Sequence, residues 1–280
     1  MAIRIITDTP SDISFDEAKE MNIDLVPLKI NVDGESYREG IDISVDQFYQ
    51  MLETSKVLPT TSTPSPDDFL TYFEEAKEAG DDVVVITLAS ALSGTYQCAI
   101  LAKDMADYPN IHVIDSEQAT LGEMVLVRYA TKLRDEGKSV QEIVDTIEAS
   151  KKKVVLLAVL DTLEYLHKGG RLPKSVAIAG GLLKIKPMIT LKDGSVEVVG
   201  KSRGIKASIK NLLAEIEKYP EFDAAAPIVY GYTASSDQCE TFKEKADEKF
   251  NLKDTKMYPI GSVIGTHAGP GAFAIGFLHK

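Results

Sequence analysis

Short apolar runs alternate along the chain with longer stretches in which apolar residues recur at helical spacing. The runs Val83 to Thr87 and Ile111 to Ile114 are rich in β-branched residues and predict strands that are buried on both faces. Amphipathic helices between such strands are typical of a parallel sheet with helices on both sides. The expected elements of this half are strands at Ile3 to Thr7, Ile23 to Ile30, Val83 to Thr87 and Ile111 to Ile114, and helices at Phe15 to Met21, Val45 to Thr54, Pro66 to Ala79, Thr95 to Tyr108, Leu121 to Glu136 and Val140 to Lys151.

A second α/β set begins at the apolar strand Val154 to Val159. Further on, Ile189 to Lys192 and Val196 to Gly200 flank Asp193-Gly194, a dipeptide that favours a hairpin turn with positive φ. We expect two lobes, about 1–153 and about 154–280, with a rigid cleft between them, and ligands of α/β sheets favour the carboxyl ends of strands. The other expected elements are a helical turn at Leu163 to Leu166, the apolar segment Gly180 to Ile189, helices at Gly204 to Tyr219 and Asp237 to Phe250, and strands at Pro227 to Thr233 and Thr255 to Ile260.

The composition is that of an ordinary folded protein, with 280 residues, 44% hydrophobic and 26% charged, and a mean hydropathy of -0.07. The longest purely apolar run, Val154 to Leu160, is far shorter than the roughly 20 residues that span a membrane. The start has no basic flank followed by a long apolar stretch, so we expect a cytoplasmic protein. Cys98 and Cys239 match no metal or redox spacing and are expected to be free thiols.

The net charge of -12 is unevenly distributed, since residues 1–150 carry -18 and residues 151–280 carry +6. Overall acidity and the absence of Trp argue against nucleic-acid binding. The excess of basic residues lies mainly in 151–210, which carries +9. This segment is either a solvated surface or a site for an anionic ligand or an acidic protein partner.

Hydroxyl groups cluster in the segment Thr60 to Pro66, just before a predicted helix. Ser65 is expected to cap that helix, with Pro66 at its first position. The cap leaves Thr60, Thr61 and Ser62 without a role, and neutral donors of this kind suit a carboxylate held without a counter-charge.

Ser93 follows the buried strand Val83 to Thr87 and stands before a helix, so its hydroxyl and the amides of Gly94 and Thr95 are placed to bind an anion. The rival interpretation is a serine nucleophile. A nucleophile elbow has Gly two residues before the serine, whereas Ala91 stands there in this chain, which favours binding.

The glycine-rich segment Gly261 to Gly271 lacks the Lys-Ser/Thr of a phosphate-binding P-loop. Within it, His267 is either structural or donates a hydrogen bond to a carboxylate. The four histidines have no metal-ligand spacing, so no metal site is expected. Asp8 and Asp12 are expected to shape the turn after the first strand.

The loop His167 to Lys174 combines two glycines with Lys168, Arg171 and Lys174. We expect this loop to lie on the surface, where its cations could bind a phosphorylated group or an acidic partner.

Taken together, several segments resemble the DegV family, the fatty-acid-binding subunits (FakB type) of bacterial fatty-acid kinase systems. The order and spacing of these segments are more specific than any one of them. The segments are Thr7 to Asp12, Thr61 to Pro64, Leu92 to Tyr96, Asp115-Ser116, Lys168 to Arg171, Lys186-Pro187 and Thr266 to Gly271.

The resemblance implies a two-lobed α/β fold with one long-chain fatty acid, such as palmitate, buried between the lobes. On this basis, the carboxylate is expected at Thr61, Ser62, Ser93, Gly94, Thr95 and His267. The resemblance also implies that Arg171, with Lys168 and Lys174, docks on a separate kinase subunit.

That kinase would phosphorylate the bound acid to an acyl phosphate for phospholipid synthesis, so no catalytic residue, no ATP site and no cofactor beyond the bound acid are expected in this chain. The chain departs from the family pattern at Thr9-Pro10 and at Thr63, where Gln is common, and acyl-chain preference is left open. Two alternatives also stay open: a lipid or small-ester hydrolase using Ser93, His267 and Asp115, and a receptor for another amphipathic acid.

Overall fold

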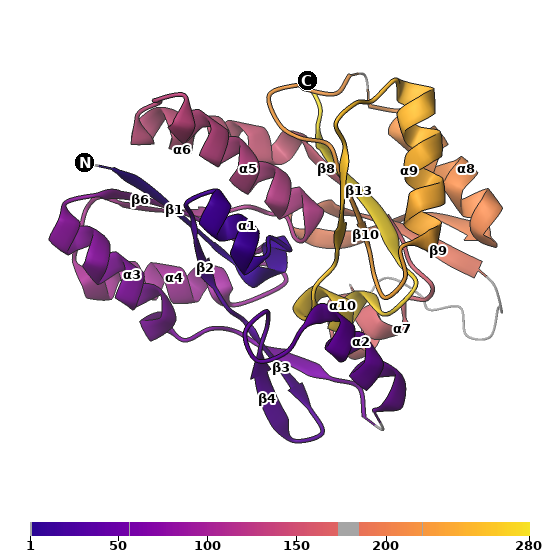
Figure 1. Cartoon of the computed structure of the whole chain (residues 1–280), viewed down its shortest axis with the longest axis horizontal. Helices are drawn as coiled ribbons and strands as arrows, with labels where there is room; N and C mark the ends of the chain where they lie inside the picture. The colour runs from indigo at the N-terminus through magenta and orange to yellow at the C-terminus, as the bar shows by residue number, and fades with distance from the viewer. Residues whose placement is uncertain (1, 56, 173–184, 220) are drawn as a thin grey trace.

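The computed structural model describes residues 2–55, 57–172, 185–219 and 221–280. Their strands form three sheets of four, six and three strands (Figure 1). The predicted α/β architecture, with a parallel sheet flanked by helices, is confirmed. No helix among these residues is both long enough and apolar enough to cross a bilayer.

The four-stranded sheet is parallel throughout, in the order β2-β1-β6-β7. Alternate residues of β6 face opposite helix layers: Val83 and Val85 pack towards α3 and α4, and Val84 and Ile86 towards α5. The elements are β1 (Ile3–Asp8), the short 3-10 helix η1 (Thr9–Ser11), α1 (Phe15–Glu20), β2 (Asp24–Val26), α3 (Pro66–Ala79), β6 (Asp82–Thr87), α4 (Thr95–Ala106), β7 (Ile111–Asp115), α5 (Leu121–Asp135) and α6 (Val140–Ser150).

The six-stranded sheet has the order β10-β9-β8-β13-β11-β12, so the last strand of the chain lies in its middle. Helices α8 and α9 cover one face, and α5 packs on the other face as well as on the four-stranded sheet (Figure 1). The proposed lobe boundary near residue 153 falls between strands of different sheets. The elements are η2 (Lys151–Lys153), β8 (Val154–Val159), β9 (Ile185–Lys192), β10 (Ser195–Arg203), α8 (Ile205–Ile216), β11 (Val229–Tyr232), α9 (Asp237–Phe250), β12 (Lys256–Pro259) and β13 (Phe273–Leu278).

The three-stranded antiparallel sheet, ordered β4-β3-β5, projects from the lower side of the molecule in Figure 1. Three helices lie beside it, and α10 contacts α2, α7, β3 and β5. The elements are β3 (Lys29–Val32), β4 (Glu35–Arg38), α2 (Val45–Thr54), β5 (Thr60–Ser62), α7 (Glu164–Lys168) and α10 (Ser262–Ala268).

Several local predictions are confirmed. Asp193 and Gly194 have φ of 47° and 75° and join β9 to β10. The backbone N–H of Ser65 donates to Asp68 Oδ2 at 2.7 Å, and Pro66 opens α3. Both cysteines are free. Residues 180–184 of the predicted apolar segment lie outside the described residues, and its remainder, Ile185 to Ile189, belongs to β9.

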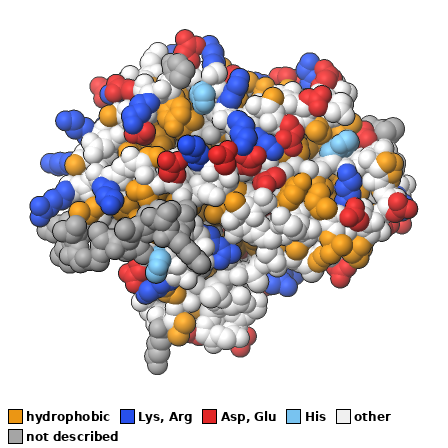
Figure 2. Space-filling view, turned by 180° about the vertical axis from the view of Figure 1, so that it is seen from behind, with side chains coloured by type: hydrophobic (Ala, Val, Ile, Leu, Met, Phe, Trp, Pro, Cys, Tyr) orange, Lys and Arg blue, Asp and Glu red, His pale blue; other side chains and the backbone are white. Residues whose placement is uncertain are grey.

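Other predictions were wrong. The run Ile23 to Ile30 is not one strand, because Pro27 has no N–H and the chain passes there from β2 to β3 in a different sheet. The glycine-rich segment after β12 contains the helix α10, which is not among the expected helices. Figure 2 shows Lys and Arg side chains gathered at its left, on the side of the six-stranded sheet, as the charge distribution predicts.

Candidate functional site

An apolar cavity lies among the three sheets. Its volume is about 120 Å³, counted as the space open to the centres of water-sized spheres. On the same measure one water needs roughly 10–15 Å³, so the cavity is much larger than a single water site. Such walls favour a hydrocarbon over water. They are formed by the aliphatic residues Leu28, Leu88, Leu92, Ala119, Leu156, Ala158, Leu160, Leu166, Ile189, Leu191, Val196, Ile260, Val263, Ile264, Ala268, Ala272 and Ala274.

The polar lining of the cavity includes most of the predicted carboxylate-binding residues. A hydrogen bond joins Thr61 Oγ1 on β5 to His267 Nε2 on α10, at 3.0 Å. The strand β5 also approaches the start of α4, since a Cβ placed on Gly94 would lie 3.5 Å from Thr63 Cγ2. The polar lining residues are Thr61, Ser62, Thr63, Ser93, Thr120, Arg171 and His267.

The structure places Gly94 and Thr95 behind Ser93 rather than in the wall. Gly94 precedes the first residue of α4, and Thr95 is fully buried. The hydroxyls of Ser93 and Thr95 lie 2.9 Å apart, so Thr95 orients the Ser93 side chain. The first amides of a helix have no acceptor within the helix, which favours negative charge beside Ser93.

His267 is held in the last turn of α10 against a glycine. A Cβ placed on Gly169 would lie 2.2 Å from His267 Nδ1, so only glycine allows this approach. Burial, and secondly the charge of Arg171, lower the pKa of His267 to about 4. The imidazole is therefore neutral near pH 7, and Nδ1 has no hydrogen-bond partner within the described residues.

Arg171, predicted to be a surface docking residue, is half-buried, and its guanidinium group donates to two backbone carbonyls. Nε donates to Leu92 O at 3.0 Å and Nη1 to Gly169 O at 2.6 Å. Lys168 is exposed and lies 2.5 Å from Glu164. Lys174 lies outside the described residues.

A surface hollow adjoins the cavity at its polar side. It offers about 380 Å³ to water-sized spheres and shares Thr61, Arg171 and His267 with the cavity, while Lys168 lines only the hollow. These three shared residues separate the apolar interior from the outside. A group bound between them is accessible from the hollow.

The contacts do not assemble the hydrolase alternative. Ser93 Oγ contacts Thr95, and His267 Nε2 contacts Thr61. Asp115 Oδ1 accepts from the backbone amides of Ser90 and Glu117, at 3.1 and 3.0 Å. Within the part of the chain that the structure describes, no serine–histidine–aspartate relay links these groups.

Sequence reasoning assigned almost no role to the buried carboxyl groups near the site. Asp8 and Asp12 do more than shape their own turn, because Asp8 accepts from the amide of Leu88 at 2.9 Å and Asp12 from that of Gly261 at 2.8 Å. Glu39 accepts from Ser262 Oγ at 2.9 Å and from the amide of Val263 at 2.8 Å. The bonds of Asp12 and Glu39 hold the start of α10, the helix that carries His267.

The carboxyl groups of Asp8 and Glu123 are both buried and close enough for each to affect the ionisation of the other. Burial raises the pKa of Asp8 to about 7 and that of Glu123 well above its ordinary value. Thr7 Oγ1 donates to Glu123 at 3.1 Å. The pair is therefore held at least partly protonated at neutral pH. Among the described residues, no three His, Cys, Asp or Glu side chains form a group that would hold a metal ion.

A model of the DegV family, described as an uncharacterised protein family, matches residues 2–280. The chain is 37% identical over 278 residues to a DegV domain-containing protein of Caldanaerobacter subterraneus, covering 99% of each. A Thermus thermophilus structure described as fatty-acid binding of a DegV family protein aligns with a TM-score of 0.91, at 29% identity over 100% of both chains. The Streptococcus pneumoniae Fatty Acid Kinase (Fak) B3 protein loaded with linoleic acid aligns with a TM-score of 0.87, also at 29% identity over 100% of both chains. The chain belongs to the DegV family.

Proposed function

We propose that this protein binds one long-chain fatty acid in the apolar cavity, with the carboxylate beside Thr61, Ser93 and His267. The observation that carries the proposal is an aliphatic cavity whose polar lining includes these three neutral donors. Burial of an acyl chain contributes about 0.8 kcal/mol per CH₂, enough for tight binding after association costs. The Thermus and Streptococcus proteins described above, which share the fold over their full length, support a fatty acid as the ligand.

Neutral donors suit this headgroup. A carboxylate buried without hydrogen bonds is strongly disfavoured, and the hydroxyls of Thr61 and Ser93 supply them. His267 is neutral, and the nearby Arg171 cation already donates to two backbone carbonyls. The carboxylate is thus held without a full ion pair and keeps a nucleophilic oxygen.

We further propose that the surface hollow is where a separate kinase reaches the carboxylate. An oxygen of the carboxylate would attack the γ-phosphorus of ATP bound to the kinase, with ADP as the leaving group. The chain would present the substrate without a catalytic residue of its own and hand the acyl phosphate to phospholipid synthesis. Lys168 on the rim of the hollow is the best placed of the described cations to contact an acidic partner.

The first experiment is mass spectrometry of the organic extract from protein purified without detergent, calibrated against protein amount. We expect about one long-chain fatty acid per chain. An empty extract, together with no uptake of added fatty acid, would contradict the proposal and make an esterase assay with Ser93→Ala as control the next step.

The kinase proposal is tested with charge reversals assayed for acyl phosphate formation by the cognate kinase. Lys168→Glu should slow phosphorylation and leave the bound lipid unchanged, whereas Lys206→Glu, an exposed lysine on α8, should do neither. Arg171→Glu is expected to lower both the rate of phosphorylation and the amount of bound lipid, because Arg171 lines the cavity as well as the hollow. Normal phosphorylation of both the Lys168→Glu and the Arg171→Glu protein would exclude this surface.

A further inference from the structure

The cavity runs along two paired central strands of the six-stranded sheet. Leu156, Ala158 and Leu160 of β8 and its continuation line it, as do Ala272 and Ala274 at the start of β13. Ala158 pairs with Ala274, and Leu156 pairs with Gly276. His267 precedes β13, so the polar end lies near Leu160. Leu156 marks the opposite end, about 13 Å away at about 3.3 Å per residue.

The hairpin β9–β10 contributes to the same far end. Thr190 pairs with Leu157, which sets the next residue, Leu191, at the level of Leu156. Val196 on β10 pairs with Leu191, and both line the cavity. Leu156, Leu191 and Val196 therefore form a row of aliphatic side chains at the end remote from the carboxylate site.

Two close contacts shut this end. A Cβ on Gly276 would lie 2.8 Å from Leu121 Cβ, so the first residue of α5 sits directly on β13. At the hairpin turn, a Cβ on Gly194 would lie 3.4 Å from the Cβ atoms of both Ala89 and Ala91. The turn thus rests on the loop that follows β6.

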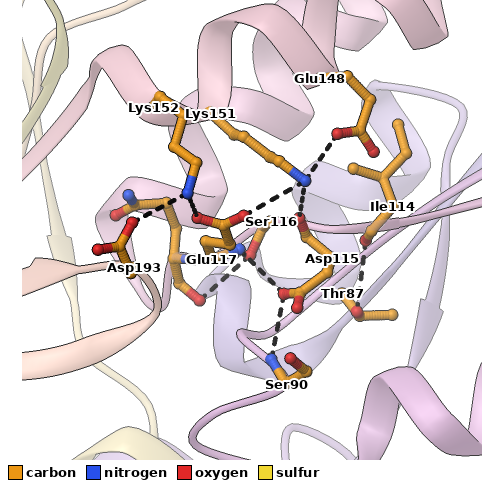
Figure 3. Close-up of polar contacts among 11 residues, drawn as sticks. Thr87, Ser90, Ile114, Asp115, Ser116, Glu117, Glu148, Lys151, Lys152 and Asp193 are labelled. Carbon is orange, nitrogen blue, oxygen red and sulfur yellow. Dashed lines mark hydrogen bonds and ion pairs between the residues drawn. The ribbon is translucent and has the colours of Figure 1, made fainter.

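A charged cluster fastens the hairpin turn from outside (Figure 3). Lys152, just before β8, contacts Glu117 and lies 3.0 Å from Asp193 Oδ1 in the turn. Glu117 is held in turn, because its amide donates to Asp115 at 3.0 Å and its carboxylate lies 3.5 Å from Lys151. Lys152 is the cation that links the loop after β7 to the hairpin.

We propose that Lys152 and the aliphatic row Leu156–Leu191–Val196 set the upper limit of acyl-chain length, which rests on the proposed function as a fatty-acid carrier. The end of a longer chain meets this row and must displace the hairpin turn. Displacement breaks the contact between Lys152 and Asp193, which are 57% and 74% exposed. An exposed pair of this kind is weak, so the limit is graded rather than absolute.

The test is competitive binding of myristic, palmitic, stearic and arachidic acids to the purified, delipidated protein. Lys152→Ala should raise affinity for the longest acids relative to palmitic acid by about 1.5-fold to fivefold, the effect of losing one exposed ion pair. Val196→Ala should also raise the relative affinity for the longest acids, because the smaller side chain leaves space in the aliphatic row. Lys153→Ala is the matched control, since this neighbouring exposed lysine forms no ion pair within the described residues and should keep the wild-type profile.

The outcomes separate the two proposals. If the wild-type protein binds none of the four acids, the fatty-acid function itself fails. If it binds them and neither Lys152→Ala nor Val196→Ala changes the relative affinities, the length limit lies elsewhere and this inference is wrong. Thermal melting of each variant checks that an altered profile comes from a folded protein.

Discussion

His267 Nε2 lies 3.0 Å from Thr61 Oγ1, a hydrogen bond between residues 206 positions apart. It joins β5 of the three-stranded sheet to α10, the helix that follows β12 of the six-stranded sheet along the chain. Both partners line the cavity, so the bond fixes the positions of the two side chains relative to each other at its polar end. Its energetic coupling can be measured.

Thr61→Val is expected to weaken fatty-acid binding about fivefold to tenfold, since one hydrogen bond contributes about 1 kcal/mol and the imidazole loses its partner. A calorimetric titration measures this effect. Thr60→Val on the exposed side of the same strand is the control and should bind normally. In a double-mutant cycle with His267→Asn, the losses should not add, and full additivity would show that the two residues act independently.

Ser93→Ala should reduce affinity for fatty acid about tenfold without abolishing binding, because the proposed carboxylate site keeps Thr61 and His267. The neighbouring Ser90→Ala should have no effect, since Ser90 does not line the cavity. Fluorescent fatty-acid displacement gives both values. Ester hydrolysis by the wild-type protein that disappears completely in Ser93→Ala would instead favour the hydrolase.

Gly169→Ala should displace His267 and lower affinity at least tenfold. Gly169 has a φ of -74°, which alanine tolerates, so the effect comes from the 2.2 Å approach to Nδ1 and not from backbone strain. The histidine ring signals in an NMR spectrum should move as well. Lys168→Ala next to it should leave both properties unchanged, and a Gly169→Ala protein with wild-type affinity would mean that the His267 position is not needed.

The free energy of unfolding should fall as pH rises from about 4 to about 7. In this range the unfolded carboxyl groups of Asp8 and Glu123 have lost their protons, while the folded pair keeps them because burial raises both pKa values. Each group contributes a slope of up to about 1.4 kcal/mol per pH unit. Stability from this pair is present below the unfolded pKa values and is lost as pH rises through the folded ones.

Glu123→Gln removes one of these titrations and should flatten the decline, as measured by urea unfolding across the pH series. Glu136→Gln, an exposed residue just after the same helix, should keep the wild-type slope. If the free energy of unfolding falls equally steeply with pH in the wild-type protein and both variants, the buried pair is not the source of the decline.

Local signals predicted local structure. Asp193-Gly194 predicted its hairpin correctly, and the same dipeptide at Asp33-Gly34, with φ of 48° and 91°, joins β3 to β4 but was missed. The helix α10 had no such signal, because Gly265 within it disfavours a helix and the stabilising carboxylate of Glu39 comes from 223 residues earlier. From the sequence, Thr61, Ser62, Ser93 and His267 could be proposed as hydrogen-bond donors. The orientation of the Arg171 side chain could not be predicted, because its hydrogen bond to the Leu92 carbonyl forms only in the folded chain.

The central place of β13 also orders events during synthesis. Its six residues, all buried, pair with β8 on one side and β11 on the other, and they are made after both partner strands. Until they leave the ribosome, both partner strands expose unpaired edges, and the wall that carries Ala274 does not exist. The cavity is therefore completed only after β13 has left the ribosome, and a nascent chain that still lacks this strand cannot enclose a ligand there.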